Sequence, residues 1–213
     1  MGIFIRLLKY LLIKIQEINE NFKYDESTIA EKFRKQGAKI GENCSIQIRK
    51  LASEPFLVEI GNSVAIAAGV SLITHDGASF IFRDEFPALR YFGKIVIEDN
   101  CFIGARSIIL PGVRIGKGSI VGMSSVVIRD VKPGSVVFGN PAIQVSTVEK
   151  YKERCLREWE NQGLSKFDPL FEGKDKFEVQ KIMMSEDYWE KLKEHLLAVP
   201  FAKGGDKEGN RGT

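Results

Sequence analysis

Two histidines are the side chains of this 213-residue sequence that are best suited to proton transfer near neutral pH. A histidine can take the proton of a hydroxyl group as that hydroxyl attacks an electrophile, which turns a weak nucleophile into an effective one. His75 lies in L-I-T-H-D-G at residues 72–77, and His195 lies in the charged segment L-K-E-H-L-L at residues 192–197. The pattern around His195 is typical of a solvated or packed helix residue, whereas the role of His75 depends on the structure that places it.

Cysteine spacing and charge argue against several classes of protein. Cys44, Cys101 and Cys155 are odd in number, far apart and in no C-x-x-C pair. This argues against a disulfide framework or a zinc ribbon and fits a reducing compartment, so we interpret the cysteines as buried or unreactive thiols and expect no metal. The net charge is +3, and basic residues are interleaved with acidic ones, so the sequence does not predict nucleic-acid binding.

The centre of the chain carries an aliphatic residue at every sixth position. Steps of six connect Ile97, Ile103, Ile109, Ile115, Val121 and Val127, and the same register includes Ile40, Ile46, Ile60, Ile66 and Leu72. Neither the helical period of 3.6 nor the alternation of a β-meander gives this spacing. Self-similarity at a short fixed period indicates a solenoid. We therefore expect an all-β core over residues 39–145, in which three hexads make one triangular coil of about 18 residues.

Two further places of the hexad carry small residues. The fifth place holds Cys101, Ser107, Val113, Ser119, Ser125 and Val131, and the second place holds Gly104, Gly116 and Gly122. We expect the aliphatic residues to point inward and stack, and the small residues to lie at tight corners where a large side chain would not fit. The glycines are expected to supply the unusual dihedral angles of the turns.

Two irregularities interrupt the register. Ile46 and Ile60 are fourteen residues apart, which predicts a two-residue excursion within R-K-L-A-S-E-P-F at residues 49–56. Leu72 and Ile97 are twenty-five apart, which predicts an inserted loop at residues 78–93. Loops on rigid scaffolds tend to carry function, and His75 ends a hexad just before this loop leaves the coil.

Helical segments are expected on both sides of the core. Residues 1–38 form an N-terminal segment with an amphipathic helix at 3–22 and a second helix from about Ser27 to Gly37. The apolar stripe of the first helix packs on protein or lies on a membrane surface, but it is too interrupted by charge to span one. Residues 146–213 contain helices at 147–161 and 175–197 and a disordered tail. We expect a cytoplasmic protein, either free or held at the inner face of the membrane by peripheral contact.

Four segments carry a family resemblance. They are L-I-T-H-D-G at 72–77, I-V-I-E-D-N-C-F-I-G-A at 95–105, I-I-L-P-G-V-R-I-G at 108–116, and V-V-I-R-D-V-K-P-G-S-V-V-F-G-N-P-A at 126–142. Together they resemble the hexapeptide-repeat acyltransferases, and especially the branch of maltose and galactoside O-acetyltransferases and of capsule and lipopolysaccharide O-acetyltransferases. The resemblance implies a left-handed parallel β-helix and a homotrimer with acetyl-CoA between neighbouring prisms. It also implies that His75 is the general base.

The same resemblance implies contacts to acetyl-CoA. Carried over by motif, the cofactor-binding residues are Gly104, Ala105, Gly122, Met123, Ile128 and Arg129. Small residues let the pantetheine arm lie against the backbone, and an arginine can bind a CoA phosphate. Met123 stands where the family usually has alanine or serine, and Ile143 stands where it usually has lysine or arginine. A phosphate contact is therefore missing, or Lys132 or a C-terminal lysine supplies it.

The inserted loop combines aromatic residues with cations. Phe80, Phe82 and Phe92 accompany the candidate substrate-binding residues Arg83, Arg90 and Tyr91. Either the aromatic residues pin the loop to the protein, or they stack on sugar rings while the arginines bind hydroxyls or phosphates. Asp76 is a further candidate, with three possible roles: it orients a ring, binds acceptor hydroxyls or caps the turn.

The resulting hypothesis is an acetyl-CoA-dependent O-acetyltransferase that acts on a sugar hydroxyl in polysaccharide or lipopolysaccharide biosynthesis. A γ-type carbonic anhydrase shares the expected fold but needs three histidines around zinc, which two histidines per chain do not supply. N-acetylation of a nucleotide-linked amino sugar would use the same base and donor and stays open. A non-catalytic hexapeptide scaffold is the remaining alternative, and the intact T-H-D-G motif argues against it.

Overall fold

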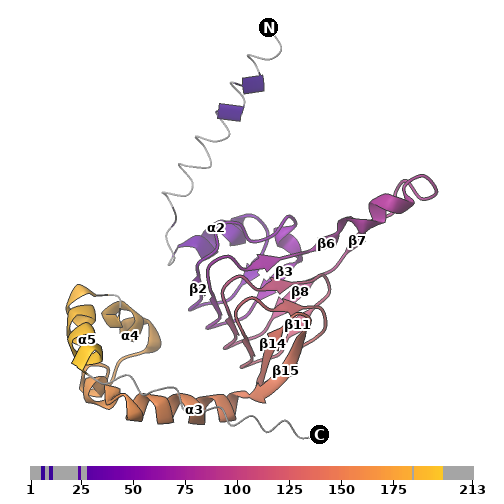
Figure 1. The fold of residues 1–213 in the computed structure, drawn as a ribbon. Helices are drawn as coiled ribbons and strands as arrows, with labels where there is room; N and C mark the ends of the chain where they lie inside the picture. The colour runs from indigo at the N-terminus through magenta and orange to yellow at the C-terminus, as the bar shows by residue number, and fades with distance from the viewer. Residues whose placement is uncertain (1–5, 8–9, 12–23, 25–27, 184, 199–213) are drawn as a thin grey trace, which may run out of the picture. The chain divides into compact units, whose positions relative to one another are not determined.

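The computed structural model describes residues 6–7, 10–11, 24, 28–183 and 185–198 (Figure 1). The chain divides into two compact units, residues 1–152 and residues 153–213. All of the β-strands belong to the first unit, and the helices beyond residue 161 belong to the second. Among the described residues, no helix is long and apolar enough to cross a membrane.

Three parallel sheets form the sides of the first unit. The first sheet contains, in order, β1 (Lys39–Ile40), β3 (Val58–Ile60), β8 (Ile95–Ile97) and β11 (Arg114–Ile115). The second contains β2 (Ser45–Ile46), β4 (Ala65–Ile66), β9 (Phe102–Ile103), β12 (Ile120–Val121) and β14 (Ser135–Gly139). The antiparallel strand β15 (Ala142–Thr147) follows β14 in this sheet. The third contains β5 (Ser71–Leu72), β10 (Ile108–Ile109) and β13 (Val126–Val127).

The chain visits these three sheets in the same order in each turn. It runs through β3, β4 and β5, then through β8, β9 and β10, and then through β11, β12 and β13. Ile97 pairs with Ile115, and Ile103 pairs with Val121, so neighbouring strands are 18 residues apart in sequence. The predicted grouping of three hexads into one turn is therefore confirmed, and Figure 1 shows the turns stacked on one another.

The aliphatic residues of the repeat fill the centre of these turns. All eleven predicted inward positions are buried, and the central ones, such as Ile103, Ile109 and Ile115, have no exposed surface. They form one continuous hydrophobic core. Burial of each such side chain contributes roughly 1.5–3 kcal/mol to the stability of the fold. The aliphatic residues at every sixth position therefore stabilise the coil as well as indicating it.

The glycines of the repeat have a different role from the one predicted. A Cβ on Gly104 would lie 2.5 Å from the amide nitrogen of Met123, and a Cβ on Gly122 would lie 2.3 Å from the ring of Phe138. These glycines do not have positive φ; they are required by close contact with the next turn. The left-handed backbone conformation falls two places later in the hexad, at Asn100, Arg106, Gly112, Gly118 and Ser124.

The small residues at the fifth place occupy the corners as predicted. Cys101, Ser107 and Ser119 are buried, and their side chains donate to carbonyl oxygens of the next turn. The Ser107 hydroxyl donates to the Gly122 carbonyl over 2.9 Å, and the Ser119 hydroxyl donates to the Lys132 carbonyl over 2.8 Å. These three corner side chains thus have their polar atoms satisfied, so a small polar side chain suits the corner as well as a small apolar one.

Helix α2 (Ile29–Lys35) lies within the predicted helix of residues 27–37. Ile29 and Phe33 are buried in the same core as the coil, and Arg34 donates to the carbonyl oxygens of Ile40 and Gly41. Gly37 has a φ of +98°, as a C-terminal capping glycine requires. Most of the apolar stripe predicted at residues 3–22 lies outside the described residues, as does the predicted disordered tail.

The predicted inserted loop is an ordered arm. It consists of β6 (His75–Asp76), the 3₁₀ helix η2 (Gly77–Phe82) and β7 (Tyr91–Phe92), and β6 pairs with β7 in antiparallel fashion. The predicted excursion at residues 49–56 contains a second 3₁₀ helix, η1 (Pro55–Leu57). Figure 1 shows the arm projecting from the stacked turns, so its base lies on the coil and its tip lies away from it.

The C-terminal helices differ in part from the prediction. Helix α3 (Val148–Asn161) matches the predicted helix of residues 147–161, and the 3₁₀ helix η3 (Leu164–Leu170) follows it. The single helix predicted at 175–197 is wrong, because α4 (Lys176–Met183) and α5 (Glu186–Ala198) are separate. Ser185 divides them: its hydroxyl donates to the Ile182 carbonyl and accepts from the Tyr188 amide at the start of α5.

Candidate active site

His75 lies where the arm leaves the third side of the coil. It follows β5 after two residues and pairs with Phe92 across the base of the arm. The amide of Gly93 donates to the carbonyl of Thr74 over 2.9 Å, which ties the returning chain to the outgoing one. The imidazole is 44% exposed, and its ring centroid lies 6.0 Å from that of Phe92. The base of the arm therefore holds an accessible histidine in a fixed position.

Glu54 is the partner of the His75 ring. The Nδ1 atom of His75 lies 2.9 Å from Oε2 of Glu54, and the Thr74 hydroxyl donates to the same oxygen over 2.5 Å. Both hydrogen bonds lower the pKa of the Glu54 carboxyl, and the one from Thr74 is the larger cause. An ionised carboxylate accepts from Nδ1–H, so the neutral ring carries its lone pair on Nε2. That arrangement suits a general base that is oriented by a carboxylate.

Glu54 was not among the residues predicted from the sequence. It lies in the irregular segment at residues 49–56, one turn of the coil before His75, and it immediately precedes Pro55. The excursion itself was predicted, and it was the available signal, since an irregular turn beside the histidine brings side chains to that histidine. The Glu54 carboxylate contacts a histidine in the next turn of the coil, and local sequence patterns do not reveal contacts between turns.

Asp76 caps the first turn of the arm. Its Oδ1 accepts a hydrogen bond of 2.7 Å from the amide of Ala78, at the start of η2. This contact matches one of the three roles considered for Asp76, the cap. Among the hydrogen bonds of the described residues, none joins Asp76 to His75, and the carboxylate that contacts the imidazole ring is Glu54.

The other candidate residues of the arm lie at its base or nearer its tip. Tyr91 and Phe92 belong to β7 and therefore lie beside Asp76 and His75. Arg83 stacks over the ring of Phe80, with 5.1 Å between the guanidinium carbon and the ring centroid. Arg90 donates to the carbonyl of Leu89 over 2.7 Å. The structure thus brings Tyr91 to the histidine, whereas the observed contacts of the two arginines are made within the arm.

The residues expected to contact acetyl-CoA lie on two edges of the third sheet. Gly104 and Ala105 follow β9, and Gly122 and Met123 follow β12, so these four stack between the second and third sheets. Ile128 and Arg129 follow β13 and lie between the third and first sheets. His75 follows β5 and therefore lies on this second edge as well. One chain alone does not bring the two groups together.

Metal ligation is not indicated by the arrangement of side chains. Across the described residues, no group of three or more histidine, cysteine, aspartate or glutamate side chains is placed to hold a metal ion. The three cysteines are free, and burial raises the pKa of the Cys44 and Cys101 thiols. A raised pKa disfavours the thiolate, which is the reactive and metal-binding form.

Known proteins share both the repeat and the coil. A family model for the hexapeptide repeat of succinyl-transferase matches residues 94–129. Protein CapG of Staphylococcus aureus is 43% identical over 129 residues, which cover 59% of this chain and 75% of that protein. Galactoside O-acetyltransferase of Lactococcus lactis is 29% identical over 158 residues, which cover 62% of this chain and 73% of that protein. The similarity therefore extends over most of each relative.

A solved structure agrees with these sequence matches. A hexapeptide-repeat acetyltransferase from Vibrio cholerae has a TM-score of 0.50 against this chain at 25% identity. The match covers 62% of this chain and 85% of that one.

Proposed function

Because this chain belongs to the hexapeptide-repeat acyltransferases, we propose that it transfers an acetyl group from acetyl-CoA to a sugar hydroxyl. One relative is a galactoside O-acetyltransferase, which supports an acetyl transfer to an oxygen atom of a sugar. The wider role is the biosynthesis of a polysaccharide or lipopolysaccharide. Residues 39–145 are the proposed acyltransferase domain, with helical extensions at 1–38 and 146–213.

The observation that carries this proposal is the contact between His75 and Glu54. With Nδ1–H held by the carboxylate, Nε2 of His75 takes the proton of the acceptor hydroxyl as its oxygen attacks the thioester carbonyl. The tetrahedral intermediate collapses by breaking the carbon–sulfur bond, and the imidazolium returns its proton to the leaving thiolate of CoA. The Glu54 carboxylate stabilises the imidazolium between these two steps, because opposite charges lie close together there.

The complete site is proposed to form between subunits of a homotrimer. His75, Ile128 and Arg129 lie on one edge of the third sheet, and Gly104, Ala105, Gly122 and Met123 lie on the other. When neighbouring prisms pack side by side, an edge of one faces the opposite edge of the next. Acetyl-CoA would then lie in the cleft, as the family resemblance implies. We also propose that the coil is left-handed, as the same family resemblance implies.

The proposed acceptor contacts are Asp76, Arg83, Arg90 and Tyr91. Tyr91 is exposed beside the histidine, where its ring offers a face to a sugar. Met123 is 63% exposed on the cofactor edge, so it would narrow the pantetheine channel as its size suggests. The free cysteines and the use of acetyl-CoA support a cytoplasmic location.

The experiment that tests this function is an acceptor screen with purified full-length protein. Release of CoA is followed with acetyl-CoA and a panel of sugars, and the acetylated products are identified by mass spectrometry. We expect CoA release that depends on an acceptor with free hydroxyls and no amine. Turnover only with amino sugars would favour N-acetylation instead. Absence of turnover with every acceptor, together with absence of acetyl-CoA binding, would favour a non-catalytic scaffold.

A further inference from the structure

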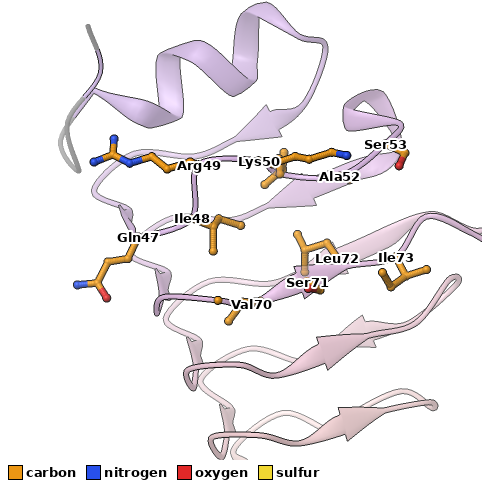
Figure 2. Close-up of a pocket in the computed structure, with 12 residues that line it drawn as sticks. Gln47, Ile48, Arg49, Lys50, Ala52, Ser53, Val70, Ser71, Leu72 and Ile73 are labelled. Atoms are coloured by element: carbon orange, nitrogen blue, oxygen red, sulfur yellow. The ribbon is translucent and has the colours of Figure 1, made fainter. Parts of the chain in front are cut away.

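A groove lies on the third side of the coil, where one strand of the repeat is missing. The first and second sheets begin with β1 and β2 in the first turn, but the third sheet begins with β5 in the second turn. Residues 47–53 cross this side without forming a strand, because the two-residue excursion breaks the register there. Between them and residues 69–73 lies a cavity of about 500 Å³ (Figure 2).

The backbone groups on the two walls of the groove are not bonded to each other. On the other two sides, first-turn amides donate to second-turn carbonyls, as Gly41 does to Ile60 and Ser45 does to Val64. Among the described residues, no backbone hydrogen bond joins 47–53 to 69–73. The groove therefore offers free carbonyl oxygens along the outer edge of β5. Such groups suit a ligand with many hydroxyls, since each hydroxyl can donate to a carbonyl.

The groove ends at the candidate catalytic pair. The upper wall, residues 47–53, continues from Ser53 to Glu54. The lower wall, residues 69–73, continues from Ile73 to Thr74 and His75. The two walls meet there, because Glu54 is hydrogen-bonded to both Thr74 and His75. A ligand that lies along the groove consequently has one end at the histidine.

Lys50 gives the groove a positive charge. Figure 2 shows its side chain running along the upper wall toward Ser53, whereas the Arg49 side chain points the other way. Arg49 donates to the carbonyl of Tyr24, at the far end of the groove. Several other cations of the coil are paired, as Lys39 is with Glu59 and Arg114 is with Glu98. Lys50 makes no ion pair or hydrogen bond in the part of the chain that the structure describes.

We propose that this groove binds the acceptor and that Lys50 selects an acceptor with an anionic group. The acceptor class is a sugar or glycan with a carboxylate or a phosphate, placed so that the anion lies near Lys50 and a free hydroxyl lies at His75. This inference rests on the proposed acetyl transfer, since it assigns an acceptor site to that reaction. A partly exposed ion pair contributes up to about a fivefold gain in affinity, and salt weakens it.

Three probes that share one ring test this assignment: methyl glucoside, methyl glucuronide and glucose 1-phosphate. Their dissociation constants are measured by titration against the full-length protein at low and high salt. We expect at least one anionic probe to bind about threefold to fivefold more tightly than methyl glucoside at low salt, and this difference to shrink at high salt. Tighter binding of the glucuronide identifies a carboxylate, and tighter binding of the phosphate identifies a phosphate.

Two variants and a control locate the binding. Lys50→Gln should remove the preference for the anionic probe, whereas Lys39→Gln, which changes an exposed lysine on the first side of the coil, should keep it. Ser71→Trp should fill the groove from the exposed face of β5 and abolish binding of all three probes. Melting temperature and acetyl-CoA affinity should stay near the wild-type values in each variant, which separates the effect from unfolding.

The outcomes distinguish the inference from the proposed function. Equal affinity for the neutral and anionic probes, or an unchanged preference in Lys50→Gln, overturns the role of Lys50. Unchanged probe binding in folded Ser71→Trp overturns the groove as the acceptor site. Neither result touches acetyl transfer, which fails only if acetyl-CoA is not consumed with any acceptor.

Discussion

The pairing of His75 with Glu54 determines which ring nitrogen is available for the proposed role as a base. The carboxylate holds Nδ1, and the exposed part of the ring is then left with the lone pair on Nε2. Removing the imidazole should therefore remove base catalysis without removing the fold. In His75→Ala we expect kcat to fall by about 10²–10⁴-fold, with little change in acetyl-CoA affinity. Steady-state kinetics and titration with acetyl-CoA measure the two quantities.

The second histidine provides the control for this variant. His195 lies within 2.6 Å of the Gln162 carbonyl and packs edge-on against Phe167, in the C-terminal unit. His195→Ala should lower the melting temperature of that unit but leave kcat near wild type. A folded His75→Ala protein with near-normal kcat contradicts the mechanism.

In the proposed mechanism Glu54 is a positioning residue, because it would act on the reaction through His75. An amide at this position can turn its NH₂ group toward Nδ1 and so favour the wrong tautomer. Glu54→Gln should reduce kcat by at least about 10-fold, and by less than His75→Ala does. KM for acetyl-CoA should change little. Glu59→Gln is the matched control, since Glu59 is a paired carboxylate on the first side of the coil. Equal kcat in the two variants would remove Glu54 from the mechanism.

The two members of this pair differ in how far the sequence could predict them. His75 sits in a short local motif next to an insertion, so its candidacy needs no knowledge of distant contacts. Glu54 reaches the ring only because the turn that precedes β3 bulges, and the hydroxyl of Thr74 fixes its carboxylate. That geometry depends on the stacking of two turns. The sixfold pattern predicts the stacking but not the direction of side chains in an irregular turn.

The sequence predicted the positions of the strands and corners of the coil better than it predicted why particular residues occupy them. Burial of every sixth residue follows from a core that is continuous along the coil axis. The glycine places were identified correctly, but close contact explains them and backbone angle does not: Gly104 lies against the amide of Met123. Sequence alone does not separate these causes, since both require a missing side chain.

Ala105 tests the proposed path of the donor along one edge of the coil. It follows Gly104 at the corner after β9, is partly exposed, and precedes the left-handed residue Arg106. A tryptophan there should obstruct the cleft without entering the core. In Ala105→Trp we expect KM for acetyl-CoA to rise about tenfold or more, a loss of roughly 1.4 kcal/mol or more in binding. Acceptor KM and melting temperature are measured alongside, and an unchanged acetyl-CoA KM excludes this path.

Carboxylates that link one turn to the next make the coil sensitive to acid. Glu98 accepts from the Lys117 amide over 2.8 Å and from Arg114 over 2.7 Å, and these bonds, the first being the larger cause, lower its pKa. A folded-state pKa below the unfolded value stabilises the protein above about pH 4.3, and this stability is lost as pH falls through the folded pKa. Melting temperature should therefore drop between pH 6 and pH 3.

A glutamine at this position should reduce the dependence on pH. Glu98→Gln should melt at a lower temperature than wild type at pH 7 and lose less on acidification, since the amide does not titrate. Glu31→Gln, which changes an exposed carboxylate on α2, is the control and should follow the wild-type curve. Calorimetry at several pH values measures both. An unaltered pH dependence in Glu98→Gln would show that this link between turns contributes little.

At the scale of the whole molecule, the proposed site is divided between two edges of one sheet. His75 lies on the edge between the third and first sheets, and Ala105 lies on the edge between the second and third. Large apolar side chains such as Phe102, Met123 and Ile128 are also exposed on the coil, where packing of a neighbour would cover them. We therefore expect light scattering to give about three times the chain mass of 23.9 kDa.

Mixing two variants tests whether the subunits complete one another's sites. Each site of the trimer would take His75 from one subunit and Ala105 from its neighbour, so His75→Ala and Ala105→Trp proteins each contain only defective sites. When the two are refolded together in equal amounts, about a quarter of the interfaces should join a normal His75 edge to a normal Ala105 edge. At acetyl-CoA concentrations below the wild-type KM, the mixture should then regain about a quarter of wild-type activity. A mixture no more active than the average of its components places both residues in the same subunit's site, and a monomer that still turns over acetyl-CoA excludes the shared site altogether.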